Sequence, residues 1–398
     1  METIDNNTQL ENFRKEVSEW LEGNCPMSMR QPLNDDSDYF WGGRDVKYKS
    51  EDQKKWFEVM KAKNWIVPHW PKEYGGGGLS KEENKIFLAE MKRLGCRLPL
   101  FSFGISMLGP ALLKFGTEEQ KKEHLTKITA GEIRWCQGYS EPNAGSDLAS
   151  LQTKAEDKGD HFVVNGQKVW TSYADQADWI FCLVRTDFEA KQGGISFLLF
   201  DMATEGVSTS PIKLISGKSP FCETFMDNVK VPKKNLLGEL NRGWTIAKYL
   251  LTHEREMISA MGNASTTAPL HETAIASIGL QNGKLNDSFI RSDIAKWSIN
   301  KAAFDITLLR AIDEFKAGQS LGAVSSFFKY YGTELNKSRL ELLMAIGGFE
   351  GLAWEGEAFN NGQLSRSFLR SKGNSIEGGT TEVQLNIVAK HILGLPSR

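Results

Sequence analysis

Two neighbouring stretches of sequence set the framework for the whole chain: WCQGYSEPNAGSDLASLQTKAE, residues 135–156, and NGQKVWTS, residues 165–172. The first contains a loop of small and hydroxyl-bearing residues, Ser140 to Asp147, whose backbone amides can approach an anion or a polar ring closely. In the second, Trp170 can stack on a planar ring while Thr171 and Ser172 bond to its edge. From the residues alone, an Asx-rich turn followed by a core tryptophan explains the pattern equally well.

The region around these stretches, from about residue 133 to 232, has a hydrophobic period of two and many β-branched and aromatic residues. Asn165-Gly166 follows His161–Val164 and precedes Gln167–Trp170, which predicts a hairpin with a type I′ turn. Further strands are predicted at 178–187, 193–202 and 207–215. The region therefore predicts an antiparallel β domain.

Helical patterns precede this β region. Apolar residues recur at three- and four-residue steps between Leu10 and Leu21, one face of a helix. Ser80–Glu83 and Thr117–Gln120 are capping boxes that open two helices, and another helix is expected to end at Gly116.

Helical spacing returns after Gly243 and continues through 294–315, 325–346 and 380–393, whereas part of 262–290 is expected to form a loop. We therefore predict an α+β chain with three domains. These are an N-terminal helical domain over 1–130, a middle β domain over 131–236 and a C-terminal four-helix bundle over 237–398.

Composition and charge exclude several classes of protein. The chain has 398 residues, of which 40% are hydrophobic and 25% charged, so a sizeable core is expected. A net charge of -2 argues against a dedicated nucleic-acid binder. The longest apolar runs, Trp179–Val184 and Ile195–Phe200, are too short for a membrane span, and the N-terminus lacks the apolar segment of a signal peptide.

The cysteine and histidine patterns indicate an intracellular protein without a structural metal. The 5 cysteines are scattered and form no CxxC pair, which predicts reduced thiols, no disulfide and a cytoplasmic location. The 6 histidines show no metal-ligand spacing, so no metal site is expected. The sequence also lacks a dinucleotide fingerprint, a phosphate loop, GxSxG and HExxH.

Four motifs, in order along the chain, resemble the acyl-CoA dehydrogenase family over essentially the whole length. YSEPNAGSD resembles the family's flavin loop, and KVWTS resembles the strand that places a tryptophan and a hydroxyl against the flavin. NVKVPKKNLLGE (228–239) and IEGGTTEVQLNIVAKHILGLP (376–396) resemble the strand that leaves the β domain and the entrance of the C-terminal helix. VPHWPKEYGG, WCQGYSEP and GWTIAKYLLTHER are similar to large subunits of bacterial pimeloyl-CoA and steroid side-chain dehydrogenases.

The resemblance implies bound FAD and α,β-desaturation of a CoA thioester. A carboxylate would remove the α-proton while the β-hydrogen leaves as hydride to the flavin, and the enzyme must polarise the thioester carbonyl to make that proton acidic. Ser146, Arg255 and Gly378 are the implied substrate contacts. The implied cofactor contacts are Gln137, Tyr139, Ser140, Gly145, Ser146, Trp170, Thr171, Ser172, Thr380 and Glu382.

The catalytic base departs from the commonest family pattern. Many members carry it just before the C-terminal GT motif, where this chain has Gly378. A second branch places its base on a bundle helix just before an arginine, and Glu254-Arg255 matches that arrangement. We therefore expect Glu254 to be the base, and we expect Arg255 either to orient it or to hold the substrate end of the site. Glu377 and Glu382 are the alternates, and Glu254 as a surface residue in a charged patch is the competing interpretation.

The resemblance also implies partners: an acyl-CoA substrate, an electron acceptor such as electron-transfer flavoprotein, and an oligomer. Homotetrameric relatives lend a neighbour's FAD an RxxFG loop and a glutamine. Here 277–293 lacks RxxFG and Met344 stands at the glutamine position. An α2β2 enzyme with a sister subunit is therefore expected, unless Arg291 reaches the phosphates by another route. A flavin monooxygenase or oxidase of the same fold, or a non-catalytic partner subunit, are the alternative functions.

Overall fold

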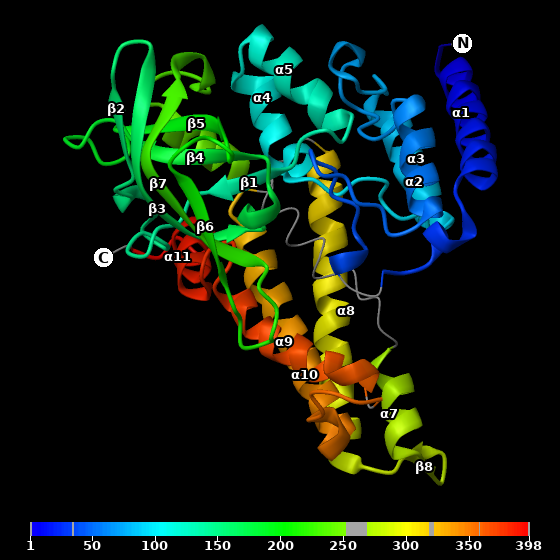
Figure 1. Cartoon of the computed structure of the whole chain (residues 1–398). Coiled ribbons are helices and arrows are strands. Elements are labelled where there is room, and N and C mark those ends of the chain that lie inside the picture. The colour runs from blue at the N-terminus through cyan, green and yellow to red at the C-terminus, as the bar shows by residue number, and fades with distance from the viewer. Residues whose placement is uncertain (1, 34–35, 252–268, 318–321, 358, 397–398) are drawn as a thin grey trace. The chain divides into compact units, whose positions relative to one another are not determined.

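The computed structural model describes residues 2–33, 36–251, 269–317, 322–357 and 359–396 (Figure 1). The chain divides into two compact units. The first comprises Met1–Pro211 and Phe221–Leu250, and the second comprises Ile212–Pro220 and Leu251–Arg398. In these described ranges no helix is long and apolar enough to cross a membrane.

Helices open the first unit, as predicted. They are α1 (Glu2–Asn24), α2 (Glu51–Ala62), α3 (Lys81–Arg93), α4 (Gly109–Phe115) and α5 (Glu118–Thr129). Both capping boxes are confirmed, since each cap side chain accepts the N3 backbone N–H and the N3 side chain returns to the cap. Helix α4 ends at Phe115 with Gly116 as its C-cap, which agrees with the predicted end.

A seven-stranded sheet completes the first unit. Its strands are β1 (Trp135–Gly138), β2 (Lys154–Asp157), β3 (His161–Ser172), β4 (Trp179–Arg185), β5 (Ile195–Asp201), β6 (Val207–Ile212) and β7 (Phe221–Pro232). The order is β1-β4-β2-β3-β7-β6, with β5 paired to β4. Strand β4 runs parallel to both β1 and β2, whereas the pairs β2–β3, β3–β7 and β4–β5 are antiparallel, as expected. The three strands expected after residue 178 are β4, β5 and β6.

The predicted hairpin at Asn165-Gly166 is wrong, because both residues lie inside the continuous strand β3. That strand pairs along its length with β7, and the register shifts between Val164 and Gly166. The side chain of Asn165 bonds to Asn228 instead of turning the chain, with its Oδ1 accepting the backbone N–H at 2.8 Å. A Cβ on Gly166 would come within 2.6 Å of the Thr153 Oγ1. The extra residue at this register shift lies in β7, where Asn228 has a φ of +54°, and long-range strand pairing overrides the local turn preference of Asn165-Gly166.

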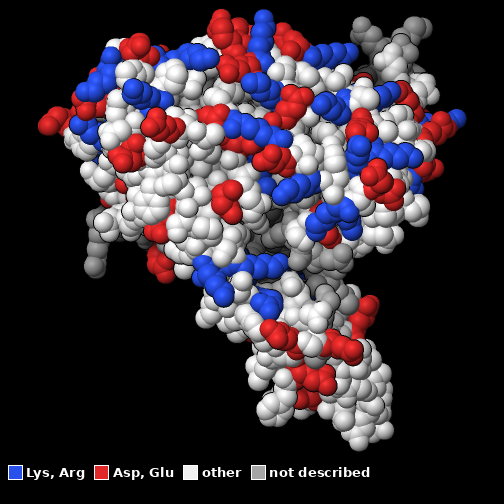
Figure 2. All heavy atoms as spheres, in the orientation of Figure 1, with Lys and Arg blue, Asp and Glu red and all other residues white. Residues whose placement is uncertain are grey.

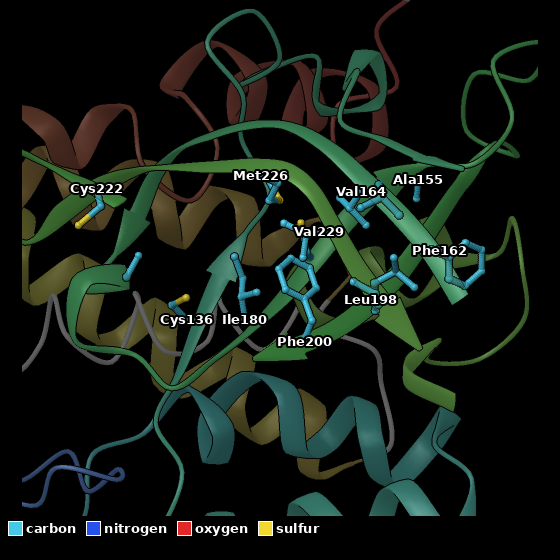
Figure 3. Packing of buried hydrophobic residues seen from close by; sticks show 14 residues of the cluster. Cys136, Ala155, Phe162, Val164, Ile180, Leu198, Phe200, Cys222, Met226 and Val229 are labelled. Atoms are coloured by element: carbon cyan, nitrogen blue, oxygen red, sulfur yellow. The ribbon is translucent and has the colours of Figure 1, made fainter. Parts of the chain in front are cut away.

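Buried side chains of the sheet form the core of the first unit, and Figure 3 shows them converging from several strands. Phe162, Ile180, Leu198 and Phe200 are almost completely buried there, and Cys136, Cys182 and Cys222 pack among them as apolar side chains. All 5 cysteines are free thiols in this structure. Basic and acidic side chains intermingle over the face of the protein seen in Figure 2, in keeping with the small net charge.

The second unit is mainly helical. It contains α7 (Leu270–Ile278), α8 (Ser288–Lys316), α9 (Val324–Gly351), α10 (Phe359–Ser371) and α11 (Thr381–His391), with a short hairpin of β8 (Leu280–Gln281) and β9 (Lys284–Leu285). Helix α9 is central: it packs against α8 through Phe304, Phe328 and Leu335, and against α7 and α10 through a second apolar cluster. Part of the expected loop over 262–290 is thus helix α7 and this hairpin.

Candidate active site

The loop that follows β1 lies beside the end of β3 in the first unit. The backbone N–H of Val169 donates to the carbonyl oxygen of Ser140 at 2.9 Å, which aligns loop and strand. Glu141 and Ala144 exchange two backbone hydrogen bonds, of 3.1 and 3.0 Å, and close a tight turn. Ser146 follows this turn and is exposed. The structure therefore brings together the two stretches that the sequence singled out.

Trp170 has an unusual backbone conformation. Its φ is +62°, a left-handed value that few residues other than glycine adopt. The register between β3 and β7 shifts between Lys168 and Thr171, so Val169 and Trp170 form a second β-bulge. The indole is 54% exposed and meets the ring of Phe221 edge-on at 6.0 Å. The interpretation of this residue as a core tryptophan is therefore wrong.

The other predicted cofactor residues of the first unit differ in exposure. Gly145 is exposed and no atom lies within 4 Å of the position of an added Cβ, whereas Gln137 and Ser172 are half-buried. Tyr139 and Thr171 are buried.

One ion pair beneath this loop was not predicted. Lys168 has a side-chain exposure of 0%, and its Nζ lies 2.8 Å from the Glu141 Oε1, whose side chain is 9% exposed. Burial alone would raise the pKa of Glu141, but the Lys168 charge and the hydrogen bonds that the carboxylate accepts bring the pKa below its ordinary value. A usable signal is present in the sequence: alternation places Lys168 on the same face of the strand as Phe162 and Val164, where an apolar residue is expected.

The turn before α11 belongs to the second unit and includes the position of the usual family base. Gly378 and Gly379 have φ values of +64° and +94°, so a residue with a side chain would be strained at either place. The Nε2 of Gln384 donates to the carbonyl oxygen of Gly378 at 3.0 Å. Lys329, buried on α9, donates to the carbonyl oxygens of Gly379 and Asn374 at 2.7 and 3.0 Å.

The two alternate bases near this turn are both engaged by other groups. The carboxylate of Glu377 accepts from Arg370 at 2.7 Å and from the Asn374 amide at 2.5 Å. Glu382 lies exposed in the first turn of α11, where hydrogen bonds from its own backbone N–H and from Thr380 lower its pKa. Thr380 caps α11, since its hydroxyl accepts the Val383 N–H at 3.2 Å. Neither carboxylate is therefore well suited to take a proton from a weak carbon acid.

The preferred base lies elsewhere. Residues 243–251 are helical, and Glu254 and Arg255 follow them outside the described residues. In the part of the chain that the structure does describe, no group of three or more His, Cys, Asp or Glu side chains could hold a metal ion.

The sequence matches three domain families in chain order. These are the acyl-CoA dehydrogenase N-terminal domain over residues 42–132, the middle domain over 136–229 and the C-terminal domain over 241–393. The chain belongs to the acyl-CoA dehydrogenase family. Its domains are helical, β and helical, as predicted, and membership makes it an enzyme of acyl-CoA dehydrogenation.

Relatives of this dehydrogenase cover its full length. Acyl-CoA dehydrogenase IpdE1 of Mycolicibacterium smegmatis is 33% identical, with 98% of each chain covered. Among solved structures, the Tcur3481-Tcur3483 steroid ACAD is 32% identical, with a TM-score of 0.77 and 98% of each chain covered. The ChsE4-ChsE5 complex from Mycobacterium tuberculosis is 29% identical, with a TM-score of 0.73 and the same coverage. Similarity thus extends to dehydrogenases built from two different proteins.

Proposed function

We propose that this dehydrogenase carries out FAD-dependent α,β-desaturation of an acyl-CoA thioester. The observation that carries the proposal is the exposed indole of Trp170, which a left-handed bulge presents beside the small-residue loop at Ser140–Ser146. Strained backbone of this kind is concentrated at functional sites. Bound FAD would supply the acceptor for the hydride that leaves the β-carbon.

The residues of the first unit fit a flavin. An aromatic face, a hydroxyl and open backbone amides are the groups that a flavin ring and its phosphates require, and Trp170, Ser172 and the exposed Gly145-Ser146 pair offer them. We assign ring contacts to Gln137, Tyr139, Ser140, Trp170, Thr171 and Ser172, phosphate contacts to Gly145 and Ser146, and further cofactor contacts to Thr380 and Glu382.

Glu254 is the base in this proposal, and Arg255 orients it. Three findings support the choice: Gly378 has no side chain, Glu377 is held by Arg370 and Asn374, and the pKa of Glu382 is lowered. Glu254 would take the α-proton, and Ser146, Arg255 and Gly378 would contact the substrate.

We propose a bulky, ring-bearing acyl group and a heteromeric assembly. One solved relative is described as a steroid ACAD, and two pair different proteins. Met344 packs into the apolar cluster of α7, α9 and α10, and it offers no amide where homotetrameric relatives use a glutamine. A sister subunit would then supply the missing phosphate contact, an electron-transfer flavoprotein would accept the electrons, and the enzyme would work in the cytoplasm.

Anaerobic reduction tests this function. The purified chain, alone and with a related subunit, is mixed with straight-chain, dicarboxylic and steroid acyl-CoAs while flavin absorbance is followed. Bleaching by a steroid acyl-CoA, with FAD below one per chain, is the expected result. Failure to take up FAD even with a partner would contradict the proposal, and rapid oxygen uptake during turnover would favour an oxidase.

A further inference from the structure

The cofactor loop is tied to the interior of the first unit by one buried lysine. Besides its ion pair with Glu141 at 2.8 Å, the Nζ of Lys168 donates to the carbonyl oxygen of Tyr139 at 3.1 Å. Lys168 therefore holds the chain on both sides of Ser140, whose own carbonyl accepts from Val169 of the same strand. Three successive residues at the start of the loop are thus bonded to two adjacent residues of β3, next to Trp170.

The same carboxylate also holds the far end of the loop. The Oε2 of Glu141 accepts the backbone N–H of Gln152 at 2.6 Å, and the Oε1 accepts that of Thr153 at 2.9 Å. Residues 142–151, including the exposed Gly145 and Ser146, form the closed loop between these anchors. Lys168 and Glu141 together thereby join β3 to the beginning and the end of the loop.

Stability alone does not explain a buried pair of this kind. The desolvation of two charges offsets most of their attraction, and apolar residues of similar size often stabilise a fold as well or better. What an apolar pair cannot do is bond to the Tyr139 carbonyl and to two backbone N–H groups at once. Those bonds set the position of the loop relative to the strand.

We propose that Lys168 and Glu141 are positioning residues, which hold the loop at Ser140–Ser146 in register with Trp170–Ser172 so that the cofactor meets a preformed site. The inference rests on the proposed FAD binding. A loop ordered in advance does not lose conformational freedom when its ligand binds, so the pair contributes to affinity without touching the ligand.

The test compares Lys168→Met, Glu141→Gln and the double variant Lys168→Met/Glu141→Leu in the full chain, with the sister subunit where it is needed. Glu90→Gln is the matched control, because Glu90 is equally buried and paired with Arg14 and Arg93 at 2.9 and 2.6 Å, far from the loop in sequence. Three readouts are measured: the FAD dissociation constant, Tm, and amide hydrogen exchange of residues 139–153 in the FAD-free chain.

Each single variant is expected to raise the dissociation constant at least about tenfold and to speed exchange in the loop, whereas Glu90→Gln lowers Tm and leaves both unchanged. In the double variant Tm should recover, but affinity and loop protection should not, because the apolar pair restores packing without the loop hydrogen bonds. Affinity that recovers together with Tm, or single variants within about twofold of the wild type, would overturn the inference. Absence of FAD binding by the wild type refutes the proposed function instead, and loop exchange still decides whether the pair orders the loop.

Discussion

Each unit of the protein buries a lysine beneath a loop that contains proposed cofactor contacts, and the two lysines are partnered differently. Lys168, under the loop after β1, contacts a carboxylate, Glu141, that belongs to the loop itself. Lys329, under the turn before α11, contacts two backbone carbonyls at 2.7 and 3.0 Å, and the carboxylates of Glu334, Glu377 and Glu382 act on it only through their charge. Loss of either Lys168 or Glu141 leaves the other as a buried charge without its partner. The hydrogen bonds of Lys329 go to backbone carbonyls, which every residue type provides.

The carboxylates near Lys329 can be tested for a role as catalytic base. The Glu377 carboxylate is held by Arg370 and Asn374, so we expect Glu377→Gln to keep most of the activity. Glu254→Gln should lower the rate of desaturation about 10²–10⁴-fold while FAD stays bound, because an amide cannot accept the proton. Single-turnover reduction by acyl-CoA measures both. The opposite ranking of the two variants would make Glu377 the base.

The two lysines should also differ in their effect on stability. Lys168→Met leaves the Glu141 carboxylate buried without its partner, which is expected to cost about 3–5 kcal/mol. Lys329→Met leaves only neutral carbonyls without a donor, at a cost of about 1–3 kcal/mol. Urea unfolding of the two variants beside the wild type gives the difference, and equal losses would remove the distinction drawn between the two units.

Opposite pH dependences would sharpen the comparison further. The pKa of Glu141 in the folded chain lies below its ordinary 4.5, so its contribution to stability is present above that value and is lost as the pH falls through the folded pKa. Burial lowers the pKa of Lys329 below 10.5, so the cost of its charge is present at neutral pH and is relieved as the pH rises towards 10.5.

Stability of the wild type relative to each variant is the relevant measurement. The wild type should lose its advantage over Glu141→Gln in acid, and it should gain on Lys329→Met as the pH rises through the alkaline range towards 10.5. These shifts are the smallest of the expected effects. A flat difference between wild type and Lys329→Met over that range would show that its ammonium is not penalised by burial.

Much of the fold could be predicted because local signals agree with it. The capping boxes at Ser80 and Thr117 open helices as expected, and the change of hydrophobic period marks the sheet. The hairpin at Asn165-Gly166 failed because the preference of two residues for a turn is weaker than the pairing of β3 with β7, a strand more than fifty residues later.

The site was predictable in part, for a related reason. The loop at Ser140–Ser146 and the strand at Trp170 could be singled out because their small and aromatic residues are visible in the sequence. The structure places the two side by side. The contacts of the two buried lysines were missed: Lys168 bonds to the Tyr139 carbonyl and Lys329 to the Asn374 carbonyl, and backbone carbonyls leave no mark in the sequence. Glu254 and Arg255 lie outside the described residues and stay a prediction.

The left-handed backbone of Trp170 carries a consequence for how this enzyme evolves. A residue other than glycine in that conformation costs the fold about 1–3 kcal/mol, so selection for stability alone would replace this tryptophan with glycine or asparagine. A function of the exposed indole would oppose that replacement. Duplicated copies that have lost the activity should therefore drift to glycine or asparagine at this position early, and copies that keep it should not.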